Sequence, residues 1–275
     1  MTTTLTRRIK GINVSKLEEG VATKRLGHTI LFSHEVGSTN KWAKDLAKLG
    51  ASEGTITIAD VQNAGIGRLG RKWISPQGGL WFSLVFRPQL AAKEAPKLIF
   101  VAGLAVAEVL RELYGLPSET KWPNDVLIHG RKVCGVLCEA SISGNSVDFV
   151  VVGLGLNANV RVQEDLPRKL RETATSLEDE LGRRVELENL FHCLIGKLEV
   201  LYLQFLTEGF LPILESWKRH AGFIGQKIVF TNSEERLAGL ALDVDEEGML
   251  LFKAEDGSIQ RVSVGDVLWQ PNVAR

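Results

Sequence analysis

The chain has 275 residues, and its 33 lysines and arginines are balanced by 33 aspartates and glutamates. This length is enough for one large domain and a small one, and 44% apolar with 24% charged residues is typical of a globular protein. The zero net charge argues against nucleic acid as the main partner, because proteins that bind it usually carry a basic excess.

The ends and the apolar runs also exclude some locations. The first eight residues have no apolar core after their charges, so we expect no signal peptide. The most apolar run, residues 98–110, is too short to cross a bilayer and contains Glu108. Three cysteines, Cys134, Cys138 and Cys193, are an odd number and fit a reducing compartment. We therefore expect a cytoplasmic protein with no membrane partner.

Local patterns predict the elements in chain order. Residues 1–27 are polar and weakly patterned, which indicates a short N-terminal arm with one helical turn at most. Further along, β-branched and apolar runs predict strands at 29–32, 55–59, 80–86, 120–128 (with a Pro-Asn-Asp turn inside it), 132–139 and 148–153. Apolar residues at helical spacing predict helices that begin at Ser38 and that span 94–114, 185–206 and 211–219.

The connections between these elements predict the fold class. Tight turns at 129–130 and 143–145 join successive strands as hairpins. We therefore predict an α+β domain over residues 28–221, with a mixed, mostly antiparallel central sheet and helices on one face. Short strands separated by Gly, Asp and Glu turns then predict a small SH3-like barrel over residues 222–275. An exposed edge of the central sheet is compatible with a homodimer.

The most distinctive segment is residues 62–73, Gln-Asn-Ala-Gly-Ile-Gly-Arg-Leu-Gly-Arg-Lys-Trp. Its glycines let the backbone approach a ligand closely, and Arg68 and Arg71 suit phosphate or carboxylate oxygens. The alternative is a solvated connection. A P-loop is excluded because no Gly-Lys-Ser/Thr follows the glycines.

Four other segments favour a binding site. Gly37-Ser38-Thr39-Asn40 either caps a helix or presents hydroxyl and amide groups to a neutral polar ligand. Lys121-Trp122-Pro123-Asn124-Asp125 is a kinked turn in which Asp125 either caps the turn or helps to hold a metal-bound triphosphate. Lys132 is either a surface lysine or a group that stabilises developing charge in a pocket. Gly153-Leu154-Gly155-Leu156-Asn157 lacks the third glycine of a dinucleotide fingerprint and suits close packing around adenine or ribose.

In this order and spacing, the five segments resemble the biotin protein ligases, which attach biotin to a lysine of a carboxylase. The resemblance runs from about Thr29 to the C-terminus and includes Ala174-Thr175-Ser176-Leu177. Its most specific motifs are Gly-x-Gly-Arg-x-Gly-Arg and Lys-Trp-Pro-Asn-Asp. It implies the central sheet of the class II aminoacyl-tRNA synthetases and a C-terminal SH3-like domain. It also implies ATP and biotin as substrates, Mg²⁺, and a biotin carboxyl carrier domain as partner.

The resemblance further implies roles for individual residues. The biotin site would comprise Ser38, Thr39, Asn40, Gln62, Gly65, Gly67, Arg68, Lys132 and Gly135. ATP or the adenylate would contact Arg68, Arg71, Trp73, Asn124, Lys132, Gly155 and Asn157. The residues expected to act in catalysis are Lys132, Arg68 and Arg71, and Asp125 is the candidate metal ligand.

Two features set this sequence apart within the resemblance. Ile66 stands where the family often has arginine, which preserves a backbone contact but not a side-chain contact. Only 28 residues precede Thr29, too few for the winged helix with which some members repress transcription, so we expect a ligase without repressor activity. We also expect residues 63–72 to be flexible without ligand and ordered with it. The alternatives are a lipoate or octanoate ligase or transferase, and a biotin-binding module without ATP–pyrophosphate exchange.

Overall fold

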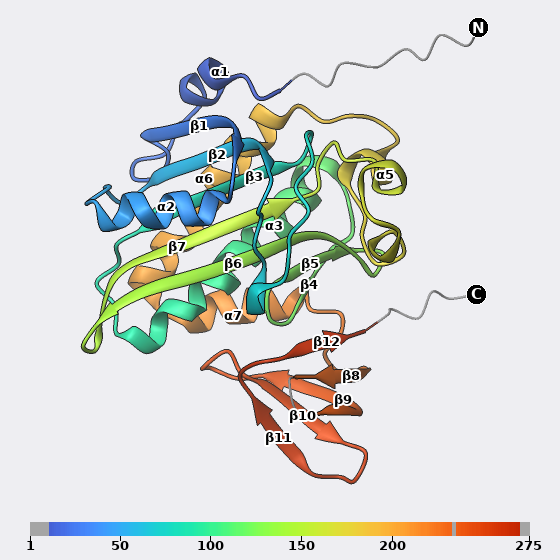
Figure 1. The fold of residues 1–275 in the computed structure, drawn as a ribbon. Coiled ribbons are helices and arrows are strands. Elements are labelled where there is room, and N and C mark those ends of the chain that lie inside the picture. The colour runs from blue at the N-terminus through green and yellow to red at the C-terminus, as the bar shows by residue number, and fades with distance from the viewer. Residues whose placement is uncertain (1–10, 233–234, 270–275) are drawn as a thin grey trace, which may run out of the picture.

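A seven-stranded mixed sheet forms the centre of the larger domain (Figure 1). The structure is a computed structural model that describes residues 11–232 and 235–269. Spatial order in the sheet is β1-β2-β3-β7-β6-β5-β4. The strands are β1 (Thr29–Val36), β2 (Thr55–Gln62), β3 (Leu80–Phe86), β4 (Ser118–Lys121), β5 (Asp125–Ile128), β6 (Arg131–Ser143) and β7 (Ser146–Leu156).

The pairing confirms a mostly antiparallel sheet. Only β1 and β2 run parallel, and the other adjacent pairs are antiparallel. One strand prediction is wrong in detail, because residues 120–128 are not a single interrupted strand. The turn after Lys121 reverses the chain, so β4 and β5 pair as a hairpin in which Lys121 lies opposite Asp125. That reversal places both side chains at one end of the sheet.

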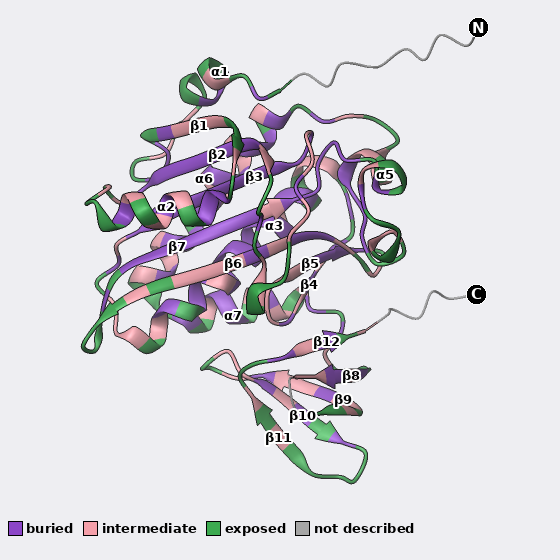
Figure 2. Ribbon diagram, viewed as in Figure 1, coloured by how far each residue is buried: buried purple, intermediate pink, exposed green. Residues whose placement is uncertain are grey.

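Helices cover both faces of this sheet. Helices were predicted on one face only, and one face is covered by α3 (Leu98–Tyr114), α6 (Leu187–Glu208) and α7 (Phe210–Arg219) (Figure 1). The opposite face is covered by α2 (Thr39–Lys48), which was not foreseen there. Ala43 and Ala47 of α2 pack against Val85, Phe149 and Val151. Successive strand residues point to opposite faces, and both faces are covered by helices, so β3 is buried along its whole length (Figure 2).

Shorter elements complete the larger domain. The N-terminal arm contains α1 (Val14–Glu19), and its residues 1–10 lie outside the described part of the chain. The remaining short helices are η1 (Arg68–Gly70), η2 (Ala92–Lys97), α4 (Val162–Asp165), η3 (Arg168–Leu170) and α5 (Leu177–Leu181). Among the described helices, α6 alone has the length and apolar composition of a membrane span, but half of it is buried in the core.

The C-terminal domain is a five-stranded antiparallel sheet with the order β11-β10-β9-β8-β12. Its strands are β8 (Lys227–Thr231), β9 (Arg236–Val244), β10 (Leu250–Ala254), β11 (Ile259–Val262) and β12 (Asp266–Leu268). Four were expected, and β12 was missed because it has only three residues. The indole of Trp122 donates to the Gly248 carbonyl at 3.0 Å, and Lys218 pairs with Asp243 at 2.7 Å. These contacts hold the small domain beside the end of the sheet where β4 and β5 meet.

Candidate active site

A cavity of about 910 Å³ lies between the central sheet, the residue 63–73 segment and the C-terminal domain. We call residues 63–73 the flap. Every residue predicted for the site lines this cavity except Gly65. The lining residues among them are Ser38, Thr39, Asn40, Gln62, Gly67, Arg68, Arg71, Trp73, Asn124, Asp125, Lys132, Gly135, Gly155 and Asn157. Five segments that are far apart in the sequence therefore meet at one place.

Gly65 has a structural position at the base of the flap. It is buried, and its carbonyl accepts a hydrogen bond from the Trp73 backbone N–H at 2.8 Å. A Cβ atom at this position would lie 2.5 Å from the Trp73 carbonyl oxygen, so only glycine allows the two arms of the flap to approach so closely. Gly65 therefore shapes the flap, and its contact with a ligand stays a prediction.

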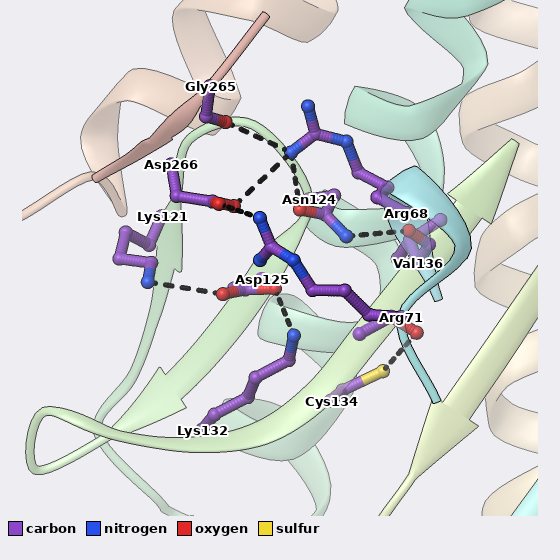
Figure 3. Close-up of polar contacts among 11 residues, drawn as sticks. Arg68, Arg71, Lys121, Asn124, Asp125, Lys132, Cys134, Val136, Gly265 and Asp266 are labelled. Carbon is purple, nitrogen blue, oxygen red and sulfur yellow. Dashed lines mark hydrogen bonds and ion pairs between the residues drawn. The ribbon is translucent and has the colours of Figure 1, made fainter. Parts of the chain in front are cut away.

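The flap is a small hairpin whose tip reaches the C-terminal domain (Figure 3). Ile66 and Lys72 form an antiparallel bridge, and the Gly67 N–H donates to the Arg71 carbonyl at 2.7 Å. At the tip, Arg68 Nη1 donates to Asn124 Oδ1 at 3.3 Å and to the Gly265 carbonyl at 3.2 Å. The side chain of Ile66 is largely exposed, so the isoleucine at this position leaves the flap backbone intact.

A single carboxylate of the C-terminal domain ties down both flap arginines. Asp266 accepts a hydrogen bond from Arg71 and lies 3.8 Å from Arg68. Burial lowers the pKa of Arg68, whereas the hydrogen bond to Asp266 raises the pKa of Arg71. Both guanidinium groups remain charged at any physiological pH. The flap arginines therefore meet an anion of the protein at the place where a ligand anion would bind.

A second carboxylate, Asp125, lies between two lysines (Figure 3). Its Oδ1 lies 2.5 Å from Lys132 Nζ, as an ion pair without a well-aligned hydrogen bond, and its Oδ2 lies 3.1 Å from Lys121 Nζ. Burial opposes ionisation of Asp125, but the two lysines outweigh it and lower its pKa to about 2. Lysine and arginine side chains outnumber carboxylates seven to three in the whole cavity lining, so the cavity attracts anions.

Two glycines form a flat floor under the Trp73 indole. Gly135 and Gly155 face each other across β6 and β7. A Cβ atom at Gly155 would lie 2.5 Å from Trp73 Nε1, and one at Gly135 would lie 3.0 Å from its ring. Lys132 Nζ lies 5.0 Å from the ring centroid. The buried indole N–H has no acceptor within the described residues, so a buried donor stays unpaired beside Gly155.

The opposite end of the cavity is neutral and rich in hydrogen-bonding groups. Ser38 caps α2, and the N–H of Thr39 donates to Gln62 Oε1 at 2.8 Å. The Thr39 hydroxyl lies 3.1 Å from the same oxygen, while Gln62 Nε2 donates to Ser75 Oγ at 2.8 Å. The Ser38–Asn40 segment therefore begins a helix and also lines the cavity, and its contact with a polar ligand stays a prediction.

Comparison with known proteins identifies the family. Residues 34–157 match the profile of the Biotin/lipoate A/B protein ligase family, and residues 223–268 match the Biotin protein ligase C terminal domain. A biotin--[acetyl-CoA-carboxylase] ligase from Paracoccus denitrificans is 35% identical over 222 residues, which cover 80% of this chain and 92% of that relative. The chain belongs to the biotin protein ligase family.

Two further relatives agree with this assignment. The bifunctional ligase/repressor BirA of Bacillus subtilis is 34% identical over 257 residues, which cover 93% of this chain and 78% of that protein. The biotin protein ligase from Aquifex aeolicus in complex with biotin and ATP is 30% identical over 88% of this chain and 98% of the other, with a TM-score of 0.74. The likeness confirms the predicted fold class for this biotin ligase.

The surroundings of Asp125 in this biotin ligase do not suit the prediction that this residue is a metal ligand. The described residues contain no group of three or more His, Cys, Asp or Glu side chains that is arranged to hold a metal ion. Both oxygens of Asp125 are already paired with lysines, so a cation there would have to displace ammonium groups. These contacts do not support Asp125 as a magnesium ligand.

Sequence reasoning missed several residues that position the biotin ligase site. Asp266 lies 195 residues from Arg71 in the chain, and no local motif marks it. Ser83 and Glu139 lie within strands whose residues were read only as sheet positions. Ser83 did carry one signal, because it is the single polar residue in the otherwise apolar strand β3.

Proposed function

We propose that this biotin ligase activates biotin with ATP in the cavity beneath the flap and then transfers it to a lysine of a biotin carboxyl carrier domain. One observation carries the proposal: the cavity combines a neutral hydrogen-bonding end with a strongly cationic end. A neutral urea ring on a chain that ends in a carboxylate matches these two ends. We assign the catalytic domain to residues 28–221 and the C-terminal domain to residues 222–275.

The neutral end is assigned to the head group of biotin. The urea of biotin offers two N–H donors and one carbonyl acceptor, and Ser38, Thr39, Asn40 and Gln62 carry the complementary groups. Gly67, Gly135 and Lys132 then border the acyl chain and its carboxylate. This arrangement brings the carboxylate to the cationic end, where the nucleotide is expected.

The first chemical step joins two anions. A carboxylate oxygen of biotin attacks the α-phosphorus of ATP, a phosphorus–oxygen bond forms, and pyrophosphate leaves with the electron pair of the bond that breaks. Arg68, Arg71 and Lys132 offset the repulsion and stabilise the charge that develops on the phosphoryl oxygens. Lys132 leaves Asp125 to do so, and Lys121 keeps that carboxylate neutralised at 3.1 Å.

The product of this step is a mixed anhydride, biotinyl-5′-AMP, which water would hydrolyse. Trp73, Asn124, Gly155 and Asn157, which line the cavity, are assigned to the nucleotide part. The flap covers the intermediate and excludes water. In the second step the acceptor lysine attacks the acyl carbon as the free amine, an amide bond forms, and AMP leaves.

Magnesium is assigned to the substrate. ATP enters as its magnesium complex, and the triphosphate oxygens supply the ligands that the described side chains do not. Electrostatic screening of the leaving pyrophosphate is the chemistry that the ion supplies. Arg68, Arg71 and Lys132 are the protein groups that act on the remaining charge.

The decisive experiment is a reconstitution with full-length protein. Biotin, Mg-ATP and a carrier domain are incubated with it, and mass spectrometry should find one biotinyl group on one lysine of the carrier. Biotin-dependent exchange of pyrophosphate into ATP tests the first step alone. If biotin binds but no exchange occurs, the protein is a binding module and the ligase proposal fails.

A lipoate ligase is the second candidate, because the matching family profile covers both biotin and lipoate ligases. The neutral end favours biotin, since its hydroxyl and amide groups can exchange hydrogen bonds with a urea ring, whereas the dithiolane ring of lipoate offers no donor. Calorimetric titration with both acids separates them, and tighter binding of lipoate would reverse the assignment.

A cytoplasmic location, the absence of nucleic-acid and membrane partners, and a homodimer all stay predictions. The central sheet ends at β1 and β4, and the outer edge of β4 is already bonded to His220 and Arg111, so β1 is the edge to consider for a second copy. Light scattering at several protein concentrations, with and without biotin and ATP, measures the oligomeric state.

A further inference from the structure

A chain of polar contacts leads from the neutral end of the cavity to an ion pair on β6. Lys44 Nζ lies 2.8 Å from Glu139 Oε1, and the other oxygen of Glu139 accepts from Asn40 Nδ2 at 3.1 Å. Asn40 Oδ1 lies 2.7 Å from the Ser83 hydroxyl, which lies 2.8 Å from Thr39 Oγ1. Of these five residues, only Thr39 and Asn40 line the cavity, so the other three act from behind it.

The carboxylate sets the orientation of the Asn40 amide. An ionised carboxylate can only accept hydrogen bonds, so Asn40 must present its NH₂ group to Glu139. The carbonyl of Leu137, another pure acceptor, lies 3.4 Å from the same nitrogen. Burial opposes ionisation of Glu139, but hydrogen bonds from Lys44 and Asn40 outweigh it and lower its pKa. Glu139 is therefore ionised at neutral pH.

The next two contacts follow from proton counting. Asn40 Oδ1 is an acceptor, so the single Ser83 proton must be donated to it. The short contact between Ser83 and Thr39 then requires the Thr39 hydroxyl to donate to Ser83. The contact from Thr39 Oγ1 to Gln62 Oε1, at 3.1 Å, is left without a proton, and Gln62 Oε1 is held by the Thr39 N–H at 2.8 Å.

The fold leaves room for this chain at one specific place. A Cβ atom at Gly153 would lie 1.8 Å from Asn40 Oδ1 and 3.1 Å from Ser83 Oγ. The glycine in β7 therefore allows Asn40 to point its oxygen toward Ser83. The remaining lone pair of Thr39 Oγ1 is left for the cavity that Thr39 lines.

We propose that Glu139 is a positioning residue for substrate recognition. Acting through Asn40 and Ser83, it turns the Thr39 hydroxyl into an acceptor for one N–H of the urea ring. This inference rests on the proposed function, since it names the contact that distinguishes biotin from acids without a urea. Glu139 thereby contributes to binding of the acid and not to activation of its carboxylate.

The test compares Glu139→Gln with Lys44→Met in the full-length protein. Glu139→Gln keeps the size but adds a donor, so the amide of Asn40 loses its fixed direction. We expect the KM for biotin in pyrophosphate exchange to rise about tenfold, with kcat and the KM for ATP within about twofold. Lys44→Met keeps the carboxylate and should change the KM for biotin by less than about threefold.

Biotin methylated on either urea nitrogen tests the direction of the hydrogen bond. The native protein should prefer biotin over both analogues, and in Glu139→Gln the preference over one of them should fall about tenfold. Ser83→Ala removes the middle hydroxyl without a charge change and should have the same effect if Glu139→Gln does not fold. An unchanged preference over both analogues overturns the inference. Absence of biotin-dependent exchange in the native protein would instead overturn the proposed function.

Discussion

Replacing Lys132 with methionine separates the two tasks that we give to this side chain. In the structure its ammonium group neutralises the buried Asp125 at 2.5 Å. In the proposed reaction it leaves that carboxylate and stabilises charge on the substrates. Methionine keeps most of the length of the side chain and removes only the charge. The variant should therefore lose some stability and most of its activity.

The stability loss follows from the charges around Asp125. Lowering its pKa from 3.8 to about 2 corresponds to about 2 kcal/mol, which is what remains of the attraction of both lysines after the cost of burial. Lys121 remains at 3.1 Å after the substitution but the cost of burial remains too, so Lys132→Met should cost about 2 kcal/mol. Loss of one preorganised cation should lower kcat for adenylation roughly a hundred- to a thousandfold, equivalent to about 3–4 kcal/mol. The chemical effect should thus clearly exceed the structural one.

Two further variants act as controls. Lys121→Met removes the other partner of the same carboxylate, so it should cost similar stability but lower kcat by less than about tenfold. The double variant Lys132→Met with Asp125→Asn removes both charges, so it should recover the stability but not the rate. Urea unfolding gives the stabilities, and biotin-dependent pyrophosphate exchange gives the rates. Near-normal exchange in Lys132→Met, or recovery of exchange in the double variant, would refute the chemical role of Lys132.

Three other predictions follow from single contacts. Gly155→Ala places a Cβ 2.5 Å from Trp73 Nε1, so the KM for ATP should rise about tenfold. Gly135→Ala, whose Cβ contact is 3.0 Å, should raise this KM less. Equal KM values in the two variants would contradict the assigned floor. Asp266→Asn removes the ion pairs with the flap arginines, so limited proteolysis within residues 63–72 should become about fivefold faster. An unchanged cleavage rate would show that these ion pairs do not restrain the flap. Because the pKa of Asp125 is lowered, the stability that its charge contributes is complete above pH 3.8, its ordinary pKa, and is lost as the pH falls towards about 2. The midpoints of urea unfolding for native protein and Asp125→Asn should therefore converge over that pH interval. Midpoints that stay equally far apart would exclude this charge effect.

Periodicity predicted most of the elements but not which face of the sheet they cover. The strand at 80–86 was located correctly, because its apolar run is bounded by glycines and a proline. The helix at α2 was also located, but the face of the sheet that it covers was not, because the apolar stripe of Ala43 and Ala47 does not show which face it meets. Strand β12 was missed because three residues are too few to show alternation.

Motifs predicted the lining of the site but not the residues behind it. Side chains that bind a ligand occur in short segments with unusual composition, such as the flap. Glu139 and Asp266 have no such local signal, because each acts on a residue far away in the chain. Glu139 lies 99 positions from Asn40, and Asp266 lies 195 positions from Arg71. Only strand register and domain packing bring such pairs together. Gly65 shows that a glycine in a binding motif can also serve the backbone of the loop.

The two ends of the cavity are built on different parts of the scaffold. Groups assigned to the head group of the acid are carried by α2, its cap Ser38 and the end of β2, whereas the charges assigned to phosphate chemistry come from the flap and from β6. Evolution or an engineer can therefore alter which carboxylic acid enters while leaving the activating apparatus untouched. Libraries restricted to positions 38–40, 62 and 83 would explore new acyl donors for labelling proteins, with the nucleotide half of the enzyme kept constant.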